Sequence, residues 1–310
     1  MKGMRGMRGL RGRAIVVVGL WGCTHEPAVP TGTTPGNPQP SVNACAVHQA
    51  TGTGPVLDPH GPYYHQMAIA NSSDGLAISN AHRVLDHASV PDGVRRADGS
   101  VLAYYVNGAE GPVWIARIQG DSAVPIGPLT LNGVSPVAGV VDPDAMLLPG
   151  DSVRLTYFAG FGPPSSTTPK AMCIAQSADG LHFTVLGAAF SYPATELLTD
   201  PSLARLPDGS WRMAISWGPR TIMAQSADGL AFTRYDTLDY GGVPEIGVTA
   251  AGALRLYVCK AGIVAYTSFD GGHAWTFEAT VVPPGTLGAN ILCDPSWVPD
   301  ANLFIFKTAY

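Results

Sequence analysis

The sequence predicts an all-β fold, a five-bladed β-propeller, and three observations favour it. A unit of about 50 residues recurs along the chain, a length typical of a four-stranded propeller blade. Five stretches headed by a proline begin such units, and short hairpins with a Ser-x-Asp-Gly turn recur between them. Each hairpin turn carries the residues that a tight turn needs.

The first half of each unit contains a proline, an apolar stretch, a turn of the Pro-Asp-Gly kind, and a strand rich in aromatic and β-branched residues. The five instances begin at Val90, Asp142, Asp200, Val243 and Asp294. Aromatic and β-branched residues favour strands, and Asp and Gly favour the turn between them. Five such hairpins predict five blades.

The second half of each unit is a hairpin around Asp179, Asp228 or Asp270, with a degenerate version from Val113. We expect these Asp residues to act in turn geometry rather than in catalysis. The last unit stops at Tyr310 after two strands, whereas residues 67–79 form an Asp-Gly hairpin with no first half before it. We therefore expect this N-terminal hairpin to close the last blade and to cover both sheet edges.

The N-terminus has the layout of an export signal. Five basic residues and no acid precede the apolar run Ala14–Trp21, which is far shorter than the roughly 20 residues that span a bilayer. The sequence Leu20-Trp-Gly-Cys23 resembles a bacterial lipobox, so we predict a signal peptide over 1–23 and a lipid on Cys23. Ordinary secretion and a retained anchor are the alternatives.

Residues 24–44 are rich in Pro, Gly and Thr and offer little apolar surface to bury, which predicts a disordered tether before a domain at 45–310. We expect the protein in the cell envelope, anchored to the outer membrane through its lipid alone, or secreted. Loss of the five leading bases from the total of 18 leaves 13 bases against 23 acids, a net charge of −10. So acidic a domain repels phosphate backbones, which excludes nucleic acid as a partner.

Four cysteines follow Cys23, at positions 45, 173, 259 and 293. In an oxidising compartment they allow two disulfides with three possible pairings. None has the Cys-x-x-Cys spacing of a zinc site. We expect structural thiols or one bridge, with the pairing open.

Six carboxylates stand one residue before or after the prolines that head the units. They are Asp92, Asp142, Asp144, Asp200, Glu245 and Asp294. Side chains two apart on a strand point to the same side, so we predict that all six converge on one axial pocket, on the face opposite the Asp-Gly turns. Crowded, poorly solvated carboxylates are costly, and glycoside hydrolysis needs one protonated and one ionised carboxyl.

The proline-headed and Ser-x-Asp-Gly hairpins resemble, over roughly residues 60–310, the five-bladed propeller glycosidases of glycoside hydrolase family 43 and its arabinosidase, xylosidase and fructosidase relatives. The resemblance implies Asp92 as the base, Asp200 as the residue that tunes the pKa of the acid, and Glu245 as the acid. Asp92 follows its proline, whereas the family's acid precedes it, and the family's Glu-Gly-Pro is here Pro-Glu-Ile-Gly. The family usually inverts, which implies carboxyls roughly 6.5–9.5 Å apart.

We expect Asp142, Asp144 and Asp294 to bind substrate. Loops on the same face span 107–112, 160–170, 218–221 and 260–262, and they carry or adjoin Trp217, Arg220 and Lys260. The tryptophan would stack on a sugar and the cations would donate hydrogen bonds, with plain packing as the alternative for each. No zinc motif occurs and no cofactor is expected, although an acidic channel permits a calcium ion.

The sequence therefore predicts an extracytoplasmic glycoside hydrolase, a monomer acting on poly- or oligosaccharide. A non-catalytic propeller lipoprotein that binds a glycan or another partner is the alternative. A sialidase is the third hypothesis, since Ser-x-Asp-Gly turns occur in sialidases. A sialidase calls for three arginines on the substrate carboxylate, a tyrosine nucleophile and normally six blades, whereas Arg220 is the one arginine that we place on the acidic face.

Overall fold

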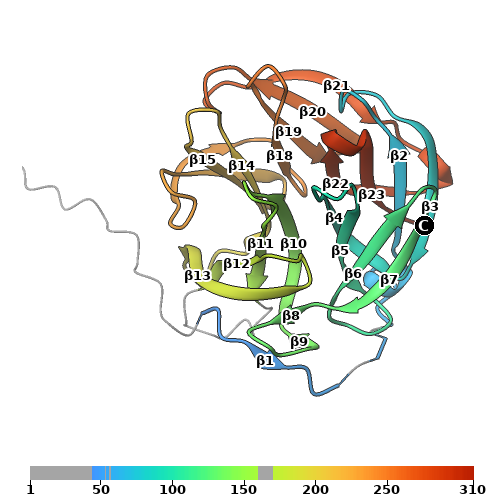
Figure 1. Cartoon of the computed structure of the whole chain (residues 1–310). Helices are drawn as coiled ribbons and strands as arrows, with labels where there is room; N and C mark the ends of the chain where they lie inside the picture. The colour runs from blue at the N-terminus through green and yellow to red at the C-terminus, as the bar shows by residue number, and fades with distance from the viewer. Residues whose placement is uncertain (1–43, 53, 56, 160–169) are drawn as a thin grey trace, which may run out of the picture. The chain divides into compact units, whose positions relative to one another are not determined.

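A computed structural model describes residues 44–52, 54, 55, 57–159 and 170–310 (Figure 1). The predicted signal peptide, Cys23, the tether up to residue 43, and residues 160–169 of one predicted loop lie outside the described residues. In the described part, no helix has the length and apolar character needed to cross a membrane.

The fold is a five-bladed β-propeller, as predicted, and each blade is an antiparallel sheet of four strands. The first blade contains β4 (Ala88–Arg95), β5 (Val101–Asn107), β6 (Val113–Gln119) and β7 (Ser122–Pro128). The second contains β10 (Val140–Leu147), β11 (Val153–Ala159), β12 (Lys170–Ser177) and β13 (His182–Tyr192), with the short β8 (Thr130–Leu131) parallel to β13. The third contains β14 (Thr199–Arg205), β15 (Trp211–Trp217), β16 (Arg220–Ser226) and β17 (Thr233–Leu238).

The fourth blade contains β18 (Glu245–Val248), β19 (Leu254–Cys259), β20 (Ile263–Ser268) and β21 (Thr276–Val282). The fifth has the order β22 (Ile291–Val298), β23 (Leu303–Ala309), β2 (Gln66–Asn71) and β3 (Ser79–Asp86), so its strands come from two distant parts of the sequence. A further two-stranded sheet pairs β1 (His48–Gln49) with β9 (Val137–Ala138). In each blade the first strand named lies nearest the centre of the ring in Figure 1.

The apolar core lies between neighbouring blades, with one cluster of buried residues at each of the five junctions. Tyr104 of the first blade and Tyr157 of the second, for example, are buried in the same cluster. Because each blade packs only against its two neighbours, this arrangement leaves the innermost strands to line the axis.

Four of the five inner strands contain a bulge at the proline that heads them. The residue before the proline has a left-handed φ of 47° at Val90, 51° at Asp142, 48° at Asp200 and 49° at Asp294, and the inner strand carries one extra residue there. Proline suits a bulge because it has no N–H to donate to the neighbouring strand, and a residue in a bulge does not need one. A bulge breaks the alternation of side chains, so the residues before and after each proline do not follow the simple two-residue rule.

The Ser-x-Asp-Gly turns have the structural role expected of them. At Asp228 the carboxylate accepts the N–H of Leu230 at 2.8 Å, while the hydroxyl of Ser226 accepts the N–H of Gly229 at 3.0 Å. An arginine of the preceding blade, Arg154, donates to the carbonyl of Gly229 at 2.9 Å. The turns thus satisfy their own backbone groups and link adjacent blades.

The described residues form two disulfides, Cys45–Cys173 and Cys259–Cys293, rather than thiols or the one bridge expected. Their Cα atoms are 5.9 and 5.1 Å apart, within the usual range for a disulfide. The first joins the segment before β1 to β12, and the second joins the end of β19 to β22. The close approach of these strands depends on tertiary packing, which the sequence positions alone do not reveal.

Candidate active site

The six predicted carboxylates all lie on inner strands. Asp92, Asp142, Asp144 and Asp294 are between 2% and 7% exposed, whereas Asp200 and Glu245 are half-buried. Their electrostatic neighbours separate them into two layers. The strand-start layer contains Asp142, Asp200 and Asp294 around Lys307, and the inner layer contains Asp92, Asp144 and Glu245 with Ser202 and Ser296.

The inner layer joins neighbouring blades through hydrogen bonds from side chain to backbone, which we call ties. At four of the five junctions the residue after the proline accepts a hydrogen bond from the N–H two residues after the proline of the next blade. The acceptor and donor pairs are Ser296 with Gly93, Asp92 with Ala145, Asp144 with Leu203, and Ser202 with Ile246. A buried N–H without a partner would be costly, so these side chains stabilise the ring.

Glu245 is the exception in this layer. No such bond from the fifth blade to Glu245 occurs among the described residues, and its Oε2 instead accepts the hydroxyl of Ser202 at 2.8 Å. At the same junction between the fourth and fifth blades, Cys259 and Cys293 form their disulfide. A hydrogen bond from the backbone of the next blade therefore accounts for Asp92 and Asp144 but does not account for Glu245.

The inner-layer carboxyls differ in protonation. Burial raises the pKa of Asp92 to about 6, so this carboxyl is mostly ionised at neutral pH. Burial, and then the charges of Asp92 and Asp144, raise the pKa of Glu245 well above its ordinary value. Glu245 therefore keeps its proton more readily than Asp92. A pair of carboxyls with separated pKa values is the arrangement that assigns an acid and a base.

The strand-start layer is held by an ion pair that the sequence analysis missed. The ammonium of Lys307 lies 2.7 Å from Oδ2 of Asp294, and the same oxygen accepts the N–H of Val90 at 3.2 Å. Oδ2 of Asp142 accepts the N–H of Asp200 at 3.3 Å. Burial, and then the charge of Asp294, raise the pKa of Asp200 to about 6. A lone lysine inside the apolar strand LFIFKTA is the signal that would have found this pair.

A histidine that borders this layer was not among the predicted site residues. Nδ1 of His65 lies 2.8 Å from the hydroxyl of Ser89, and both side chains are buried. Burial, and then the charge of Lys307, lower the pKa of His65 to about 4, so the imidazole is neutral at physiological pH.

A cavity of about 200 Å³ adjoins the inner layer on the side of the Asp-Gly turns. Asp144 and Glu245 line it, together with apolar residues of the inner strands such as Met146 and Val298. Arg95 and Asp300 border it near the turns. The cavity thus gives Glu245 a space next to its carboxyl.

The three predicted sugar-contacting residues contact side chains of their own blades, the third and the fourth. Trp217 and Arg220 pair across the β15–β16 hairpin, with the guanidinium 5.6 Å from the ring centre, and Arg220 also pairs with Asp239 at 3.3 Å. Lys260 donates to the hydroxyl of Tyr266 at 2.8 Å. None of the three lines the cavity, and their binding of a sugar stays a prediction.

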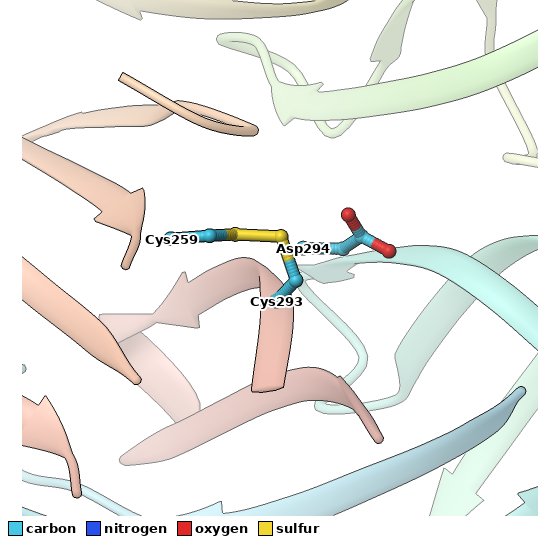
Figure 2. A group of neighbouring side chains, drawn as sticks. All are labelled: Cys259, Cys293 and Asp294. Carbon is cyan, nitrogen blue, oxygen red and sulfur yellow. A yellow bond between two sulfur atoms is a disulfide. The ribbon is translucent and has the colours of Figure 1, made fainter. Parts of the chain in front are cut away.

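The one group of possible metal-ligating side chains found in the described part of the chain does not suit a calcium ion. In that part of the chain, one group of three possible ligands has its atoms within 4.8 Å of one another, and it contains Cys259, Cys293 and Asp294. Figure 2 shows that the two sulfurs are bonded to each other, so they are not thiolate ligands. Calcium takes about six to eight oxygen ligands, and one carboxylate does not supply them.

No protein-family model matches the sequence, and no curated protein matches it. The fold, as predicted, is similar to that of family-43 glycoside hydrolases. An α-L-arabinofuranosidase from Clostridium thermocellum aligns with a TM-score of 0.50, covering 66% of this chain and 77% of that protein at 11% identity. A thermostable family-43 glycoside hydrolase also gives 0.50, covering 71% and 87% at 11% identity. An endo-arabinanase from Bacillus licheniformis gives 0.49, covering 74% and 87% at 12% identity.

Proposed function

We propose that this chain is an extracytoplasmic glycoside hydrolase in which Glu245 is the general acid and Asp92 the general base. The observation that carries the proposal is the position of Glu245, which lines a cavity, accepts the hydroxyl of Ser202 rather than a backbone N–H of the next blade, and has a raised pKa. A protonated carboxyl beside an ionised one is what cleavage of a glycosidic bond requires.

Asp144 takes the tuning role that the family resemblance implies for Asp200. The charges that raise the pKa of Glu245 are those of Asp92 and Asp144, which share its layer, whereas Asp200 belongs to the strand-start layer with Asp142 and Asp294. In this proposal Glu245 protonates the leaving oxygen, and Asp92 takes a proton from the attacking water. Asp142, Asp200 and Asp294 hold the neighbouring strand starts together.

The test uses chromogenic arabinosides, xylosides, fructosides and galactosides with the wild type and with Glu245→Gln and Asp92→Asn. We expect turnover of at least one substrate by the wild type, and a loss of about 10²-fold or more in each variant, since each removes one proton-transfer group. Asp121→Asn, in an exposed turn, is the control that should leave turnover unchanged. Equal turnover by the wild type and Glu245→Gln would remove Glu245 as the acid.

A non-catalytic glycan-binding propeller is the second candidate, because Asp92 and Asp144 already accept backbone hydrogen bonds. Carboxylates used in this way have fewer lone pairs left for a reacting proton. Sugar binding by calorimetry, without any product over days, would decide for this candidate. We further propose that the domain is exported and carries a lipid on Cys23, which mass spectrometry of the purified protein tests.

A further inference from the structure

The axial cavity has an entrance that the sequence did not predict. We propose that it binds one neutral sugar residue, which enters from the face of the propeller that carries the Asp-Gly turns. The proposal rests on the proposed function for its chemistry. It reverses the expectation that substrate approaches from the strand-start face.

The lining of the cavity gives the direction of entry. It runs from Glu245 in the inner layer to Arg95, Leu147 and Asp300 at the turn ends of three inner strands. On the other side of the inner layer, Asp294 is 2% exposed and the side chain of Lys307 is 12% exposed. Passage from that side would require these paired groups to move, whereas Arg95 and Asp300, which line the cavity at the turn side, are exposed to solvent.

A glycine creates the space in front of Glu245. Glu245 and Gly247 are two residues apart on β18 and both line the cavity, as the alternation of a regular strand requires. A Cβ atom placed on Gly247 would meet nothing within 4 Å. The equivalent positions of the first, second and fifth blades carry Val94, Met146 and Val298, which also line the cavity. The missing side chain in the fourth blade therefore leaves room beside the acid.

The chemistry of the lining suits a single sugar ring. Protonated Glu245 donates a hydrogen bond and the Asp144 carboxylate accepts one, as hydroxyl groups require. The apolar wall, which includes Met146 and Val298, suits the C–H face of a ring. About 200 Å³ lies below the roughly 300–1,000 Å³ of pockets for larger ligands. Among the described residues that line the cavity, Arg95 is the one cation, and it already donates to the carbonyl of Asp300, so an anionic sugar is not favoured.

The experiment fills the cavity without disturbing the fold. D-Xylose, L-arabinose, D-galactose and D-fructose are titrated by calorimetry into the wild-type protein, Gly247→Leu and the control Gly52→Leu. Gly52 is exposed and resembles Gly247 in two respects: a Cβ added there would meet nothing within 4 Å, and its φ is not left-handed. We expect at least one sugar to bind the wild type and Gly52→Leu equally, and to bind Gly247→Leu at least about tenfold more weakly, because the leucine occupies the site.

Unchanged binding by Gly247→Leu, or no binding of any of the four sugars to the wild type, would overturn the proposal. Thermal unfolding checks that Gly247→Leu is folded, and Gly247→Val, whose branched side chain suits a strand, decides by the same criterion if it is not. Binding in the cavity without cleavage would refute the proposed hydrolysis alone. Cleavage that continues unchanged in Gly247→Leu would refute this inference alone.

Discussion

Asp92→Asn should flatten the pH dependence of stability, because Asp92 is a buried carboxyl whose pKa rises on folding. Its pKa increases from 3.8 to about 6, and at about 1.4 kcal/mol per pH unit this shift is worth about 3 kcal/mol. A folded pKa above the unfolded one means that the contribution to stability is complete below pH 3.8 and is lost as the pH rises through 6. Most of that loss falls between about pH 4 and about pH 7.5.

The assay is urea unfolding of the wild type and Asp92→Asn at pH 4 and pH 7.5. Asparagine keeps an oxygen to accept the N–H of Ala145, so the tie between blades stays in place while the titration is removed. The free energy of unfolding of the variant, relative to the wild type, should rise by about 2–3 kcal/mol between the two pH values. Asp121→Asn should show no such change. An equal difference at both pH values would contradict the burial argument.

Two further predictions concern the fourth blade and the proposed chemistry. Replacing Cys259 and Cys293 together by alanine opens a loop of 34 residues. The chain-entropy model for such a loop gives a decrease of about 4 kcal/mol in the free energy of unfolding. An unchanged urea midpoint would contradict a stabilising role for this disulfide. The pH profile of hydrolysis should be bell-shaped, with activity rising through about pH 6 as Asp92 ionises and falling at higher pH as Glu245 loses its proton. A profile whose acidic limb stays in place in Asp92→Asn would assign that limb to another group.

The recurrence of proline-headed and Asp-Gly hairpins was enough to predict the number of blades. Each hairpin carries its own turn chemistry, and a hairpin such as that around Asp228 forms the same local bonds wherever it stands. The strands of each hairpin can therefore be predicted from its local sequence. The contact that joins Arg154 to the next blade is not local, and nothing in the spacing of its neighbours predicted it.

The six carboxylates were found from the sequence, but their grouping into two layers was not. The two-residue rule assumes a regular strand, and the left-handed residue before the proline, such as Asp142 or Asp200, interrupts it. The partner of Asp294 comes from β23 through Lys307, which lies on a different strand. Pairings of this kind depend on strand register, which a sequence pattern specifies only weakly where no turn fixes it.

Asp144→Ser should separate the structural role of the inner layer from its chemical one. Ser202 and Ser296 make the same tie with a hydroxyl, so an aspartate is not needed to hold two blades together. Burial, and then the charge of Asp92, raise the pKa of Asp144 well above its ordinary value, so this aspartate has a cost that serine would not have.

We therefore expect Asp144→Ser to unfold at no lower temperature than the wild type at pH 7.5, as residues retained for function often reduce stability. Its hydrolysis should fall off at a lower pH than that of the wild type, because Glu245 loses a neighbour whose charge raises its pKa. Ser202→Ala is the matched comparison, since it removes a tie without removing a carboxyl and should lower stability. A marked loss of stability in Asp144→Ser, with an unchanged pH profile, would show that Asp144 acts only as a link between blades.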